Sequence, residues 1–233
     1  MKKKHLSNYQ ICILCGGKGE RLKPITNKVP KPLININGVP ILNYIIKHLE
    51  SSGAKDLIIA SGYKSKMITE YFMNNHNHLN ISIVDSGNVD IIKRLLEVRK
   101  IVKDKLIVCY GDTIADVNIH NLIEFHNNNP GKISVSSYEV RSQFGLFESN
   151  HEGLINDYKE KPILDGRINI GYFVIEKALL NELHNFNTFQ EFISFCVKNT
   201  MMYNYFHDGY HITVNTINEL QEAEENINLL IKK

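Results

Sequence analysis

Residues 11–22 read ICILCGGKGERL, a short apolar run that leads directly into a glycine-rich segment. A few apolar residues before turn-forming residues are typical of a short buried strand. Three glycines within residues 16–19 let the backbone approach a ligand closely and direct its amides toward it. The pattern favours a strand followed by a phosphate-binding loop, although a tight structural turn explains the glycines equally well.

The glycine-rich segment lacks the two best-known phosphate motifs. A P-loop ends in Gly-Lys followed by Ser or Thr, and no such string occurs in the chain. A dinucleotide-binding fingerprint needs a glycine at position 22, where this chain has Leu22, which disfavours a dinucleotide-dependent oxidoreductase. Lys18 and Arg21 nevertheless bring positive charge to the place where phosphates would bind.

A second segment of interest is VPKPL, residues 29–33, in which Lys31 stands between two prolines. Proline fixes its own backbone and restricts the residue before it, so we expect the chain to be extended on both sides of Lys31. This restriction would limit where the ammonium group can reach. We interpret Lys31 as a second phosphate contact; a solvated lysine on a surface loop is the alternative.

Apolar runs alternate with helical patterns through the first half of the chain. The runs are rich in Ile and Val, and the segments between them carry apolar residues at helical spacing. Such alternation predicts a doubly wound α/β fold with a mostly parallel sheet and helices on both faces. Ligands of such sheets bind beyond the carboxyl ends of the strands. The predicted strands are residues 11–14, 56–60, 81–84 and 105–110, and the predicted helices are 41–52, 64–72 and 91–102.

The second half reads as strands with fewer helices between them. We expect a mixed-strand lobe that covers the crevice and binds the second substrate, with a turn at Asp165-Gly166. Without a repeat or a composition shift, the chain is interpreted as a single domain, 1–233, with a nucleotide-binding half at about 9–130 and an acceptor-binding half at about 131–233. The predicted strands are residues 132–138, 168–176, 202–206 and 210–214, and capping boxes predict helix starts at Thr188 with Glu191 and at Thr216 with Glu219.

The composition is that of an ordinary globular protein. The formal net charge of +2 gives too weak a field to indicate nucleic acid or a membrane as a partner. The basic start at residues 1–4 is expected to be a frayed terminus, because the next apolar run, residues 11–14, is too short for a signal peptide or a membrane span. No CxxC pair stands in a metal-finger or thioredoxin context, so we expect structural thiols in a reducing, cytoplasmic protein. The cysteines are Cys12, Cys15, Cys109 and Cys196.

The two lysine-bearing segments follow each other in a fixed order: Gly16-Gly17-x-Gly19-x-Arg21-Leu22, then Pro30-Lys31-Pro32-Leu33, then residues 34–42. This order resembles the signature of the sugar-phosphate nucleotidyltransferases, over about residues 11–231. Within the family the chain is most similar to the glucose-1-phosphate cytidylyltransferases. The resemblance implies a Rossmann-like fold, Mg²⁺ as cofactor, and transfer from a nucleoside triphosphate, with CTP favoured, to a sugar 1-phosphate. The stretches that carry the closer likeness are residues 62–64, 70–72, 84–87, 94–95, 110–112, 115–117, 144–145, 160–162 and 168–174.

The resemblance also implies roles for individual residues. Asp112 follows an apolar strand, where a carboxylate would face the crevice and suit Mg²⁺; an aspartate that only bonds its own turn is the alternative. Arg21 would neutralise the leaving pyrophosphate, and Lys31 would hold the α-phosphate. Lys161 would orient the attacking phosphate, although a Glu-Lys pair in a loop is otherwise a solvated surface pair. The remaining implied contacts are Leu14, Gly16, Gly17, Lys18, Gly19, Ser86, Gly87, Arg94 and Gly111 with the nucleotide, and Gly145, Glu160 and Asn169 with the acceptor.

The chain departs from the family pattern in two places. Where relatives place a second metal-binding Asp before a Thr, this chain has Asn215, which keeps a carbonyl oxygen but has no charge. Asn215 either ligates Mg²⁺ or only introduces the helix that Thr216 caps, and Asp116 is a candidate replacement carboxylate. Residues 90–94 lack the Thr-Gly-Gly of the cytidylyltransferases. Guanylyl or other nucleotidyl transfer to a heptose phosphate or a non-sugar phosphate is therefore an alternative, and so is a non-catalytic nucleotide-binding sensor or subunit. Assembly into a homo-oligomer is left open.

Overall fold

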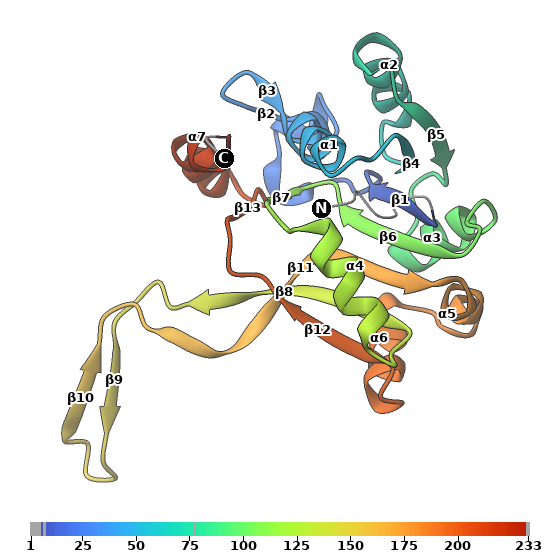
Figure 1. Cartoon of the computed structure of the whole chain (residues 1–233). Coiled ribbons are helices and arrows are strands. Elements are labelled where there is room, and N and C mark those ends of the chain that lie inside the picture. The colour runs from blue at the N-terminus through green and yellow to red at the C-terminus, as the bar shows by residue number, and fades with distance from the viewer. Residues whose placement is uncertain (1–5, 7, 77, 232–233) are drawn as a thin grey trace.

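The computed structural model describes residues 6, 8–76 and 78–231; the basic start at residues 1–4 lies outside them. Among the described residues, seven strands form one central sheet in the order β12-β8-β11-β6-β1-β4-β5, in which β11 alone runs antiparallel to its neighbours (Figure 1). The predicted doubly wound, mostly parallel α/β fold is confirmed. The strands are β1 (Tyr9–Leu14), β4 (Asp56–Ser61), β5 (Asn80–Asp85), β6 (Lys105–Tyr110), β8 (Ile133–Arg141), β11 (Ile163–Glu176) and β12 (Met202–Phe206).

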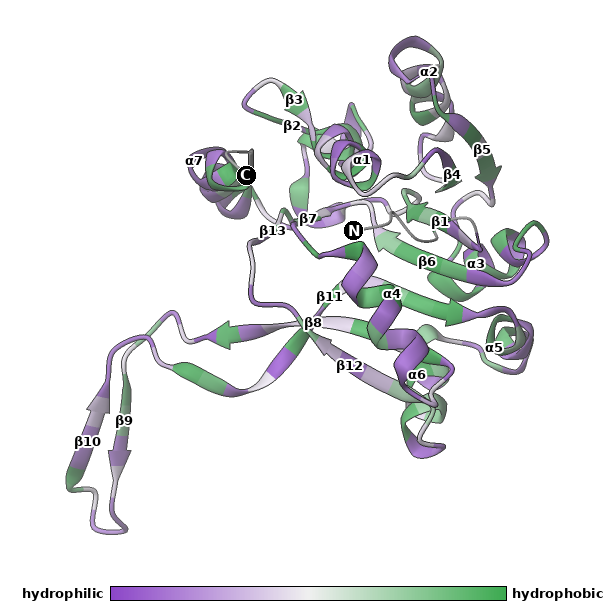
Figure 2. Ribbon diagram, viewed as in Figure 1, coloured by the Kyte–Doolittle hydropathy of each residue, from purple (hydrophilic) through white to green (hydrophobic). Residues whose placement is uncertain are grey.

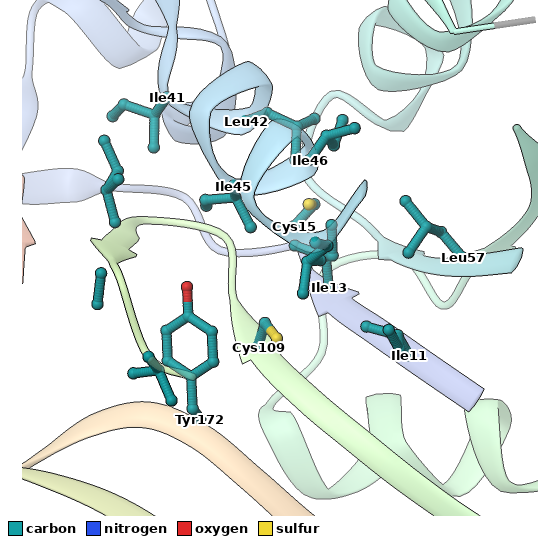
Figure 3. Close-up of a cluster of buried hydrophobic side chains, with 14 of the residues drawn as sticks. Ile11, Ile13, Cys15, Ile41, Leu42, Ile45, Ile46, Leu57, Cys109 and Tyr172 are labelled. Atoms are coloured by element: carbon teal, nitrogen blue, oxygen red, sulfur yellow. The ribbon is translucent and has the colours of Figure 1, made fainter. Parts of the chain in front are cut away.

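Helices cover both faces of this sheet. Successive residues of a strand point to opposite faces, so Ile11 and Ile13 of β1 belong to one buried cluster while Cys12 belongs to the other. Figure 3 shows the first cluster, in which side chains of α1 face those of β1. Helices α1, α2, α4 and α7 contribute to that cluster, and α3, α5 and α6 to the opposite one. The helices are α1 (Ile41–Ser51), α2 (Ser65–Asn75), α3 (Ile91–Arg99), α4 (Ile119–Asn128), α5 (Lys177–Asn181), α6 (Phe189–Lys198) and α7 (Ile217–Ile231).

Two short strands outside the central sheet bring distant segments together. β7 (Thr113–Ala115) follows β6 after a two-residue turn, and it pairs antiparallel with β13 (His211–Thr213). In this ladder Thr113 lies opposite Thr213. The pairing therefore places the turn after β6 beside the residues that precede α7. A further small ladder joins β2 (Asn35–Ile36) to β3 (Val39–Pro40) ahead of α1.

The predicted capping boxes begin α6 and α7, with one change in the return bond. Thr216 Oγ1 accepts a hydrogen bond from the Glu219 amide at 3.2 Å. The Glu219 carboxylate accepts at 2.6 Å from the amide of Asn215 instead of from that of Thr216. The box at Thr188 and Glu191 is built in the same way, with the residue before the threonine donating to the glutamate. The start of α7 is thus tied to Asn215, which precedes it.

An arm projects from the end of the sheet at which β8 ends and β11 begins. β8 and β11 continue beyond the body, and the hairpin of β9 (Leu146–Ser149) and β10 (Ile155–Lys159) extends from their ends (Figure 1). Figure 2 shows hydrophobic residues concentrated on β6 and on the part of β11 inside the body, whereas polar and apolar residues alternate along the arm. The second-half strands therefore extend the central sheet, and the arm points away from the body (Figure 1). That these strands cover the crevice and bind the second substrate stays a prediction.

The turn predicted at Asp165-Gly166 is also wrong, because these residues lie inside β11. Gly166 has a φ of +99°, and the register with β8 shifts between Ile163 and Arg167. Pairing with β8 continues on both sides of this position. Asp165 and Gly166 therefore form an irregularity within a long strand, as an isolated glycine in a strand commonly does.

The cysteines are all free and buried, as expected of structural thiols. Burial raises the pKa of the Cys12 thiol to about 12, and it also raises the pKa of Cys15 and of Cys109. Such thiols stay protonated at neutral pH and pack as small apolar groups. Within the part of the chain that the structure describes, no helix is both long and apolar enough to cross a membrane.

Candidate functional site

A cleft of about 520 Å³ opens at the carboxyl ends of β1 and β6, where the crevice of such a sheet is expected. Of the residues predicted from the sequence, Leu14, Gly16, Gly17, Arg94 and Asp112 line it. The cleft is flanked by the N-terminal ends of α3 and α6. Its lining also includes residues that the sequence analysis did not assign to the site: Val89, Asp90, Ile91, Tyr110, Thr188, Phe189 and Gln190.

Arg94 holds one wall of the cleft together. Arg94 belongs to α3 and is only 3% exposed. Its guanidinium donates hydrogen bonds to backbone carbonyls and to a hydroxyl group of the protein. The guanidinium joins the first glycine-rich turn to the segment after β5, because it contacts the carbonyls of Gly16 (3.3 Å) and Gly87 (3.1 Å). It also donates to the carbonyls of Ser61 and Val89 and to the hydroxyl of Ser86.

These contacts give Arg94 a positioning role that the sequence analysis did not foresee. Burial lowers the pKa of Arg94, while nearby Asp85 opposes that shift. Because the hydrogen bonds of the guanidinium go to carbonyl and hydroxyl oxygens, it shapes the loop formed by Ser86 and Gly87. The predicted direct contact of Arg94, Ser86 and Gly87 with a nucleotide stays a prediction.

The glycines of the first loop serve two different purposes. A side chain at Gly16 would overlap the guanidinium of Arg94, so this glycine is required by packing. A Cβ at Gly17 would meet no atom within 4 Å, so its exposed backbone is free to approach a ligand. Gly19 has a φ of +61° and begins the 3₁₀ turn Glu20–Leu22, while a Cβ at Gly111 would crowd the carbonyl of Leu14. The structural turn is thus present, and the contact of this loop with a ligand stays a prediction.

Lys31 lies at the centre of a polar cluster. Its side chain is nearly buried, and Nζ donates to Asp112 Oδ2 at 2.5 Å and to Asn215 Oδ1 at 2.8 Å. Asp112 stands in the turn between β6 and β7, and Asn215 stands between β13 and α7. The β7–β13 ladder described above brings these two residues together. The structure therefore joins the predicted phosphate contact and both predicted metal ligands in one place.

The backbone around Lys31 differs from the expectation of an extended chain. Pro30 is extended, but Lys31–Leu33 form a 3₁₀ turn in which the Leu33 amide donates to the Pro30 carbonyl at 2.9 Å. Pro32 fits this turn because its missing amide falls where the first amides of a helix have no partner. The turn directs Lys31 inward, so the alternative of a solvated surface lysine is wrong.

Two other predicted cations are exposed near the first loop. Lys18 follows Gly17, and Arg21 lies in the 3₁₀ turn Glu20–Leu22. Neither forms an ion pair with the residues that the structure describes. Both side chains are therefore available to an anionic ligand in the adjacent cleft.

The predicted acceptor residues are not gathered at the cleft. Gly145, Glu160 and Lys161 lie on the exposed arm, and the Glu160 carboxylate accepts a hydrogen bond from the Tyr158 hydroxyl. Asn169 lies nearer, on β11, where its Oδ1 accepts from the Gly171 amide at 2.8 Å. Burial raises the pKa of Tyr110, a lining residue of the cleft, and a hydrogen bond with Asn169 opposes this. The structure thus connects Asn169 with the cleft and leaves the other three on the arm.

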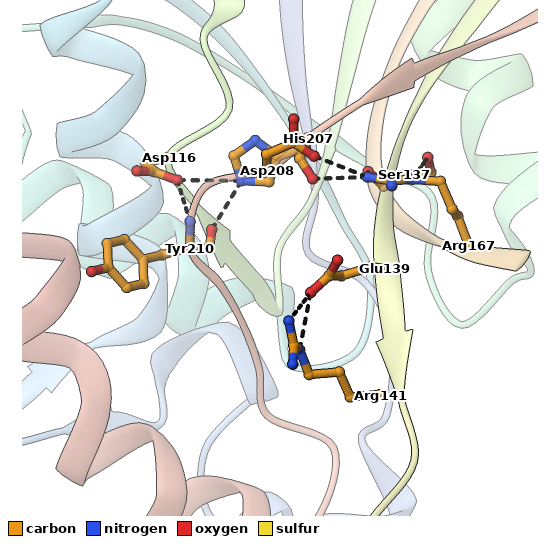
Figure 4. A network of polar contacts seen from close by, with 8 residues as sticks. All are labelled: Asp116, Ser137, Glu139, Arg141, Arg167, His207, Asp208 and Tyr210. Atoms are coloured by element: carbon orange, nitrogen blue, oxygen red, sulfur yellow. Dashed lines mark hydrogen bonds and ion pairs between the residues drawn. The ribbon is translucent and has the colours of Figure 1, made fainter. Parts of the chain in front are cut away.

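Asp116, a candidate replacement for the missing carboxylate, is committed elsewhere (Figure 4). Its Oδ1 accepts from the Tyr210 amide at 2.6 Å and lies 3.2 Å from His207 Nε2. Arg167 holds the same segment from β11, because it donates to the His207 carbonyl at 3.0 Å and to Ser137 Oγ. Asp116 therefore holds the segment that precedes β13, and it is not part of the Lys31 cluster.

The residues missed by the sequence analysis are three apolar residues, three polar ones (Asp90, Thr188 and Gln190) and Tyr110. Val89, Ile91 and Phe189 read as core residues in a sequence, and their exposure to the cleft depends on how α3 and α6 end at the sheet. Tyr110 is the exception, since it directly precedes Gly111 and Asp112 at the end of β6. Its position at a strand end was a usable signal.

Known proteins are similar to this chain in sequence and in fold. A family model described as Nucleotidyl transferase matches residues 11–212. The probable glucose-1-phosphate cytidylyltransferase of Bacillus subtilis is 31% identical over 240 residues, covering 91% of this chain and 94% of that protein. The D-glycero-alpha-D-manno-heptose 1-phosphate guanylyltransferase of Campylobacter jejuni is 30% identical, over 79% of this chain and 84% of its own length. The crystal structure of HddC from Yersinia pseudotuberculosis complexed with GMP-PN has the same fold, with a TM-score of 0.74 at 22% identity and coverage of 94% of this chain and 99% of that one.

Proposed function

The chain belongs to the nucleotidyl transferase family, and on that premise we propose that it transfers a cytidylyl group from CTP to a sugar 1-phosphate, giving a CDP-sugar and pyrophosphate. Family membership confirms the resemblance drawn from the glycine-rich and Pro-Lys-Pro segments. It makes the chain a nucleotidyltransferase of nucleotide-sugar biosynthesis, whose substrates are a nucleoside triphosphate and a sugar phosphate. The choice of CTP and the roles of individual residues are the proposed part.

The observation that carries the proposal is the cluster of Lys31, Asp112 and Asn215 beside the cleft. A nearly buried lysine between two oxygen ligands places a cation and a potential metal site next to each other. Lys18 and Arg21 add exposed cations across the first loop. This distribution suits a triphosphate, whose phosphates carry charge along their whole length. It suits a neutral or dinucleotide ligand less well.

The reaction we propose is an in-line displacement without a covalent enzyme intermediate. An oxygen of the acceptor phosphate attacks the α-phosphorus of the triphosphate and forms the new P–O bond. The bond from the α-phosphorus to the bridging oxygen breaks, and pyrophosphate leaves with that electron pair. Lys31 would hold the α-phosphate, and Arg21 would neutralise the departing pyrophosphate. Positioning and charge stabilisation supply most of the catalysis in such transfers.

The donor atoms of the cluster fit Mg²⁺. Asp112 offers a carboxylate and Asn215 a carbonyl oxygen, and Mg²⁺ takes one or two such protein ligands together with substrate phosphates. Asp112 and Asn215 would hold the ion, which when bound supplies further neutralisation of phosphate charge. Lys31 contacts the same two oxygens in this structure. We propose that its ammonium turns to the α-phosphate when the triphosphate binds.

CTP and GTP are the two candidates for the nucleoside triphosphate substrate. CTP is supported by the motif resemblance and by the Bacillus relative, which is named a cytidylyltransferase. GTP is supported by the Campylobacter relative, which is named a heptose 1-phosphate guanylyltransferase, and by residues 90–94, where the Thr-Gly-Gly of the cytidylyltransferases is absent. Val89 and Ile91 give this part of the cleft an apolar wall. Guanylyl transfer to a heptose phosphate is therefore the second candidate function.

The deciding experiment measures pyrophosphate release with Mg²⁺ for CTP, GTP, UTP, dTTP and ATP, each against a panel of sugar 1-phosphates. Thermal shifts with each triphosphate are recorded on the same samples. We expect turnover with CTP and one hexose 1-phosphate. Turnover with GTP and a heptose phosphate would replace the first candidate with the second. Stabilisation by a triphosphate without turnover would support a sensor, and no stabilisation by any triphosphate would refute the proposed nucleotide site.

A further inference from the structure

A second group of side chains that could hold a metal ion lies at the amino ends of the strands, whereas the cleft lies at their carboxyl ends. Glu50 is near the end of α1, which leads into β4, and His76 and His78 lie between α2 and β5. These three residues precede the amino ends of β4 and β5, whereas the cleft lies at the carboxyl ends of β1 and β6. The cluster is therefore separate from the proposed nucleotide site, and the inference below does not rest on the proposed function.

The three side chains converge on a small volume. One ligand atom from each lies within 4.8 Å of those of the other two. His78 Nε2 is 2.6 Å from Glu50 Oε1, and the rings of His76 and His78 have centroids 6.0 Å apart. The members come from two segments that the sheet brings together, since β4 and β5 are adjacent parallel strands.

His76 supplies an independent sign of a ligand. The residue is 6% exposed, and its Nδ1 is buried with no hydrogen-bond partner among the described residues. Its other ring nitrogen, Nε2, lies 3.2 Å from the Tyr71 hydroxyl. If Nε2 donates to Tyr71, Nδ1 carries a free lone pair, which is the form in which a histidine binds a metal ion. A buried polar atom left without a partner costs free energy, and a bound ion would remove that cost.

We propose that Glu50, His76 and His78 form a binding site for a divalent transition-metal ion of the Zn²⁺ class. Two imidazoles and one carboxylate suit Zn²⁺, Co²⁺ or Ni²⁺, whereas Mg²⁺ prefers oxygen ligands. Tyr71 fixes the orientation of the His76 ring, as hydrogen-bond partners of metal-binding histidines commonly do. Burial lowers the pKa of His76, which keeps its ring neutral and able to bind.

Binding requires a small local adjustment. Zn²⁺ holds nitrogen and oxygen ligands at roughly 2.0–2.1 Å in tetrahedral geometry, so ligand atoms stand roughly 3.3 Å apart. The direct contact of 2.6 Å between His78 and Glu50 must therefore open. Both side chains are partly exposed, which gives them room to move. The bound ion would tie the end of α1 to the connection before β5, the edge strand of the sheet.

The test is a Zn²⁺ titration of the full chain against a chromophoric chelator, with melting temperature measured in parallel. We expect one saturable Zn²⁺ per chain, unaffected by excess Mg²⁺, and a rise in melting temperature on binding. His78→Ala should weaken Zn²⁺ binding by at least about tenfold, because loss of even a hydrogen-bond partner of a ligand costs ~10–100-fold. The matched control is His120→Ala, which removes an exposed histidine of α4 and should change neither result.

Two further measurements keep the outcome decisive. Glu50→Gln preserves the shape of the side chain but removes its charge, and it should also weaken Zn²⁺ binding. Both variants should melt in one cooperative transition in the absence of Zn²⁺, as the unchanged chain does, which shows that they fold. Equal Zn²⁺ affinity in His78→Ala and the unchanged chain would place the ion elsewhere and overturn the proposal. Failure of the unchanged chain to bind Zn²⁺ saturably would overturn it as well.

Discussion

Lys31 and Lys161 are both expected to contact phosphate, yet they lie in opposite surroundings. Lys31 is 8% exposed, and Asp112 and Asn215 hold its ammonium in place before any ligand arrives. Lys161 lies on the exposed arm, with a backbone φ of +45°. The arm is a two-stranded ribbon, a structure that is only marginally stable by itself. We propose that the nucleotide side of the site is preorganised, whereas the acceptor side becomes ordered when its ligand binds.

The strongest test of preorganisation is Lys31→Ala. Asp112 and Asn215 hold the Lys31 ammonium beside the cleft, from where it would turn to the α-phosphate. Its loss should lower the turnover number by roughly 10²–10³-fold, comparable to the loss of an oxyanion donor. The measurement is pyrophosphate release at saturating substrates, with melting temperature as a check on folding. Lys28→Ala is the matched control, because Lys28 is exposed in the same segment. Near-normal turnover in Lys31→Ala would remove Lys31 from the proposed mechanism.

Arg94→Lys tests whether the cleft wall depends on a buried guanidinium. Lysine keeps the charge but lacks the planar fork, so several of the carbonyls that Arg94 contacts lose their donor. Each unpaired buried acceptor costs ~1–3 kcal/mol, and we expect the free energy of unfolding to fall by about 3 kcal/mol. Urea denaturation measures this. Arg99→Lys, at the end of the same helix, should stay within about 0.5 kcal/mol of the unchanged chain, and an equally small change in Arg94→Lys would show that the wall does not need the fork.

Lys161→Ala probes the arm. If Lys161 meets the acceptor only after binding, its loss should raise the KM for the sugar phosphate by about tenfold, equivalent to about 1.4 kcal/mol, and leave the KM for the triphosphate unchanged. Lys159→Ala is the matched control on β10, where Lys159 pairs with Glu148 at 2.6 Å. Equal effects of the two substitutions would mean that the arm contributes through its general charge or fold and that Lys161 has no specific role.

Asn215→Asp should have the smallest effect. It restores a carboxylate beside Asp112, and ion affinity rises with the number of charged ligands. We expect the Mg²⁺ concentration for half-maximal activity to fall roughly threefold, at unchanged maximal turnover. The measurement is a Mg²⁺ titration of pyrophosphate release, and Asn199→Asp, at an exposed asparagine after α6, is the control. An unchanged Mg²⁺ requirement would indicate that Asn215 serves only Lys31 and the start of α7.

Local features of the sequence predicted much of this protein. The spacing of apolar residues depends only on the helix and strand repeats, so the alternation of strands and helices around the parallel sheet was predictable. The glycine-rich loop was predictable because its glycines directly follow the apolar run of β1. The Pro-Lys-Pro segment was interpreted less well, because proline restricts two torsion angles but does not decide whether the next residues turn. The 3₁₀ turn that directs Lys31 inward was therefore missed.

Pairings between distant segments decided the rest. Asn215 meets Asp112 only because β13 pairs with β7 in one register, and Gly16 must be a glycine because Arg94 reaches it from α3. The departure of the arm from the body follows from the length of β8 and β11 beyond their neighbours. The sequence by itself determined the backbone preferences and the family signatures, because both lie in local residue patterns. Register, side-chain reach and the exposure of long strands arise from contacts between residues far apart in the chain, so only the tertiary structure decided them.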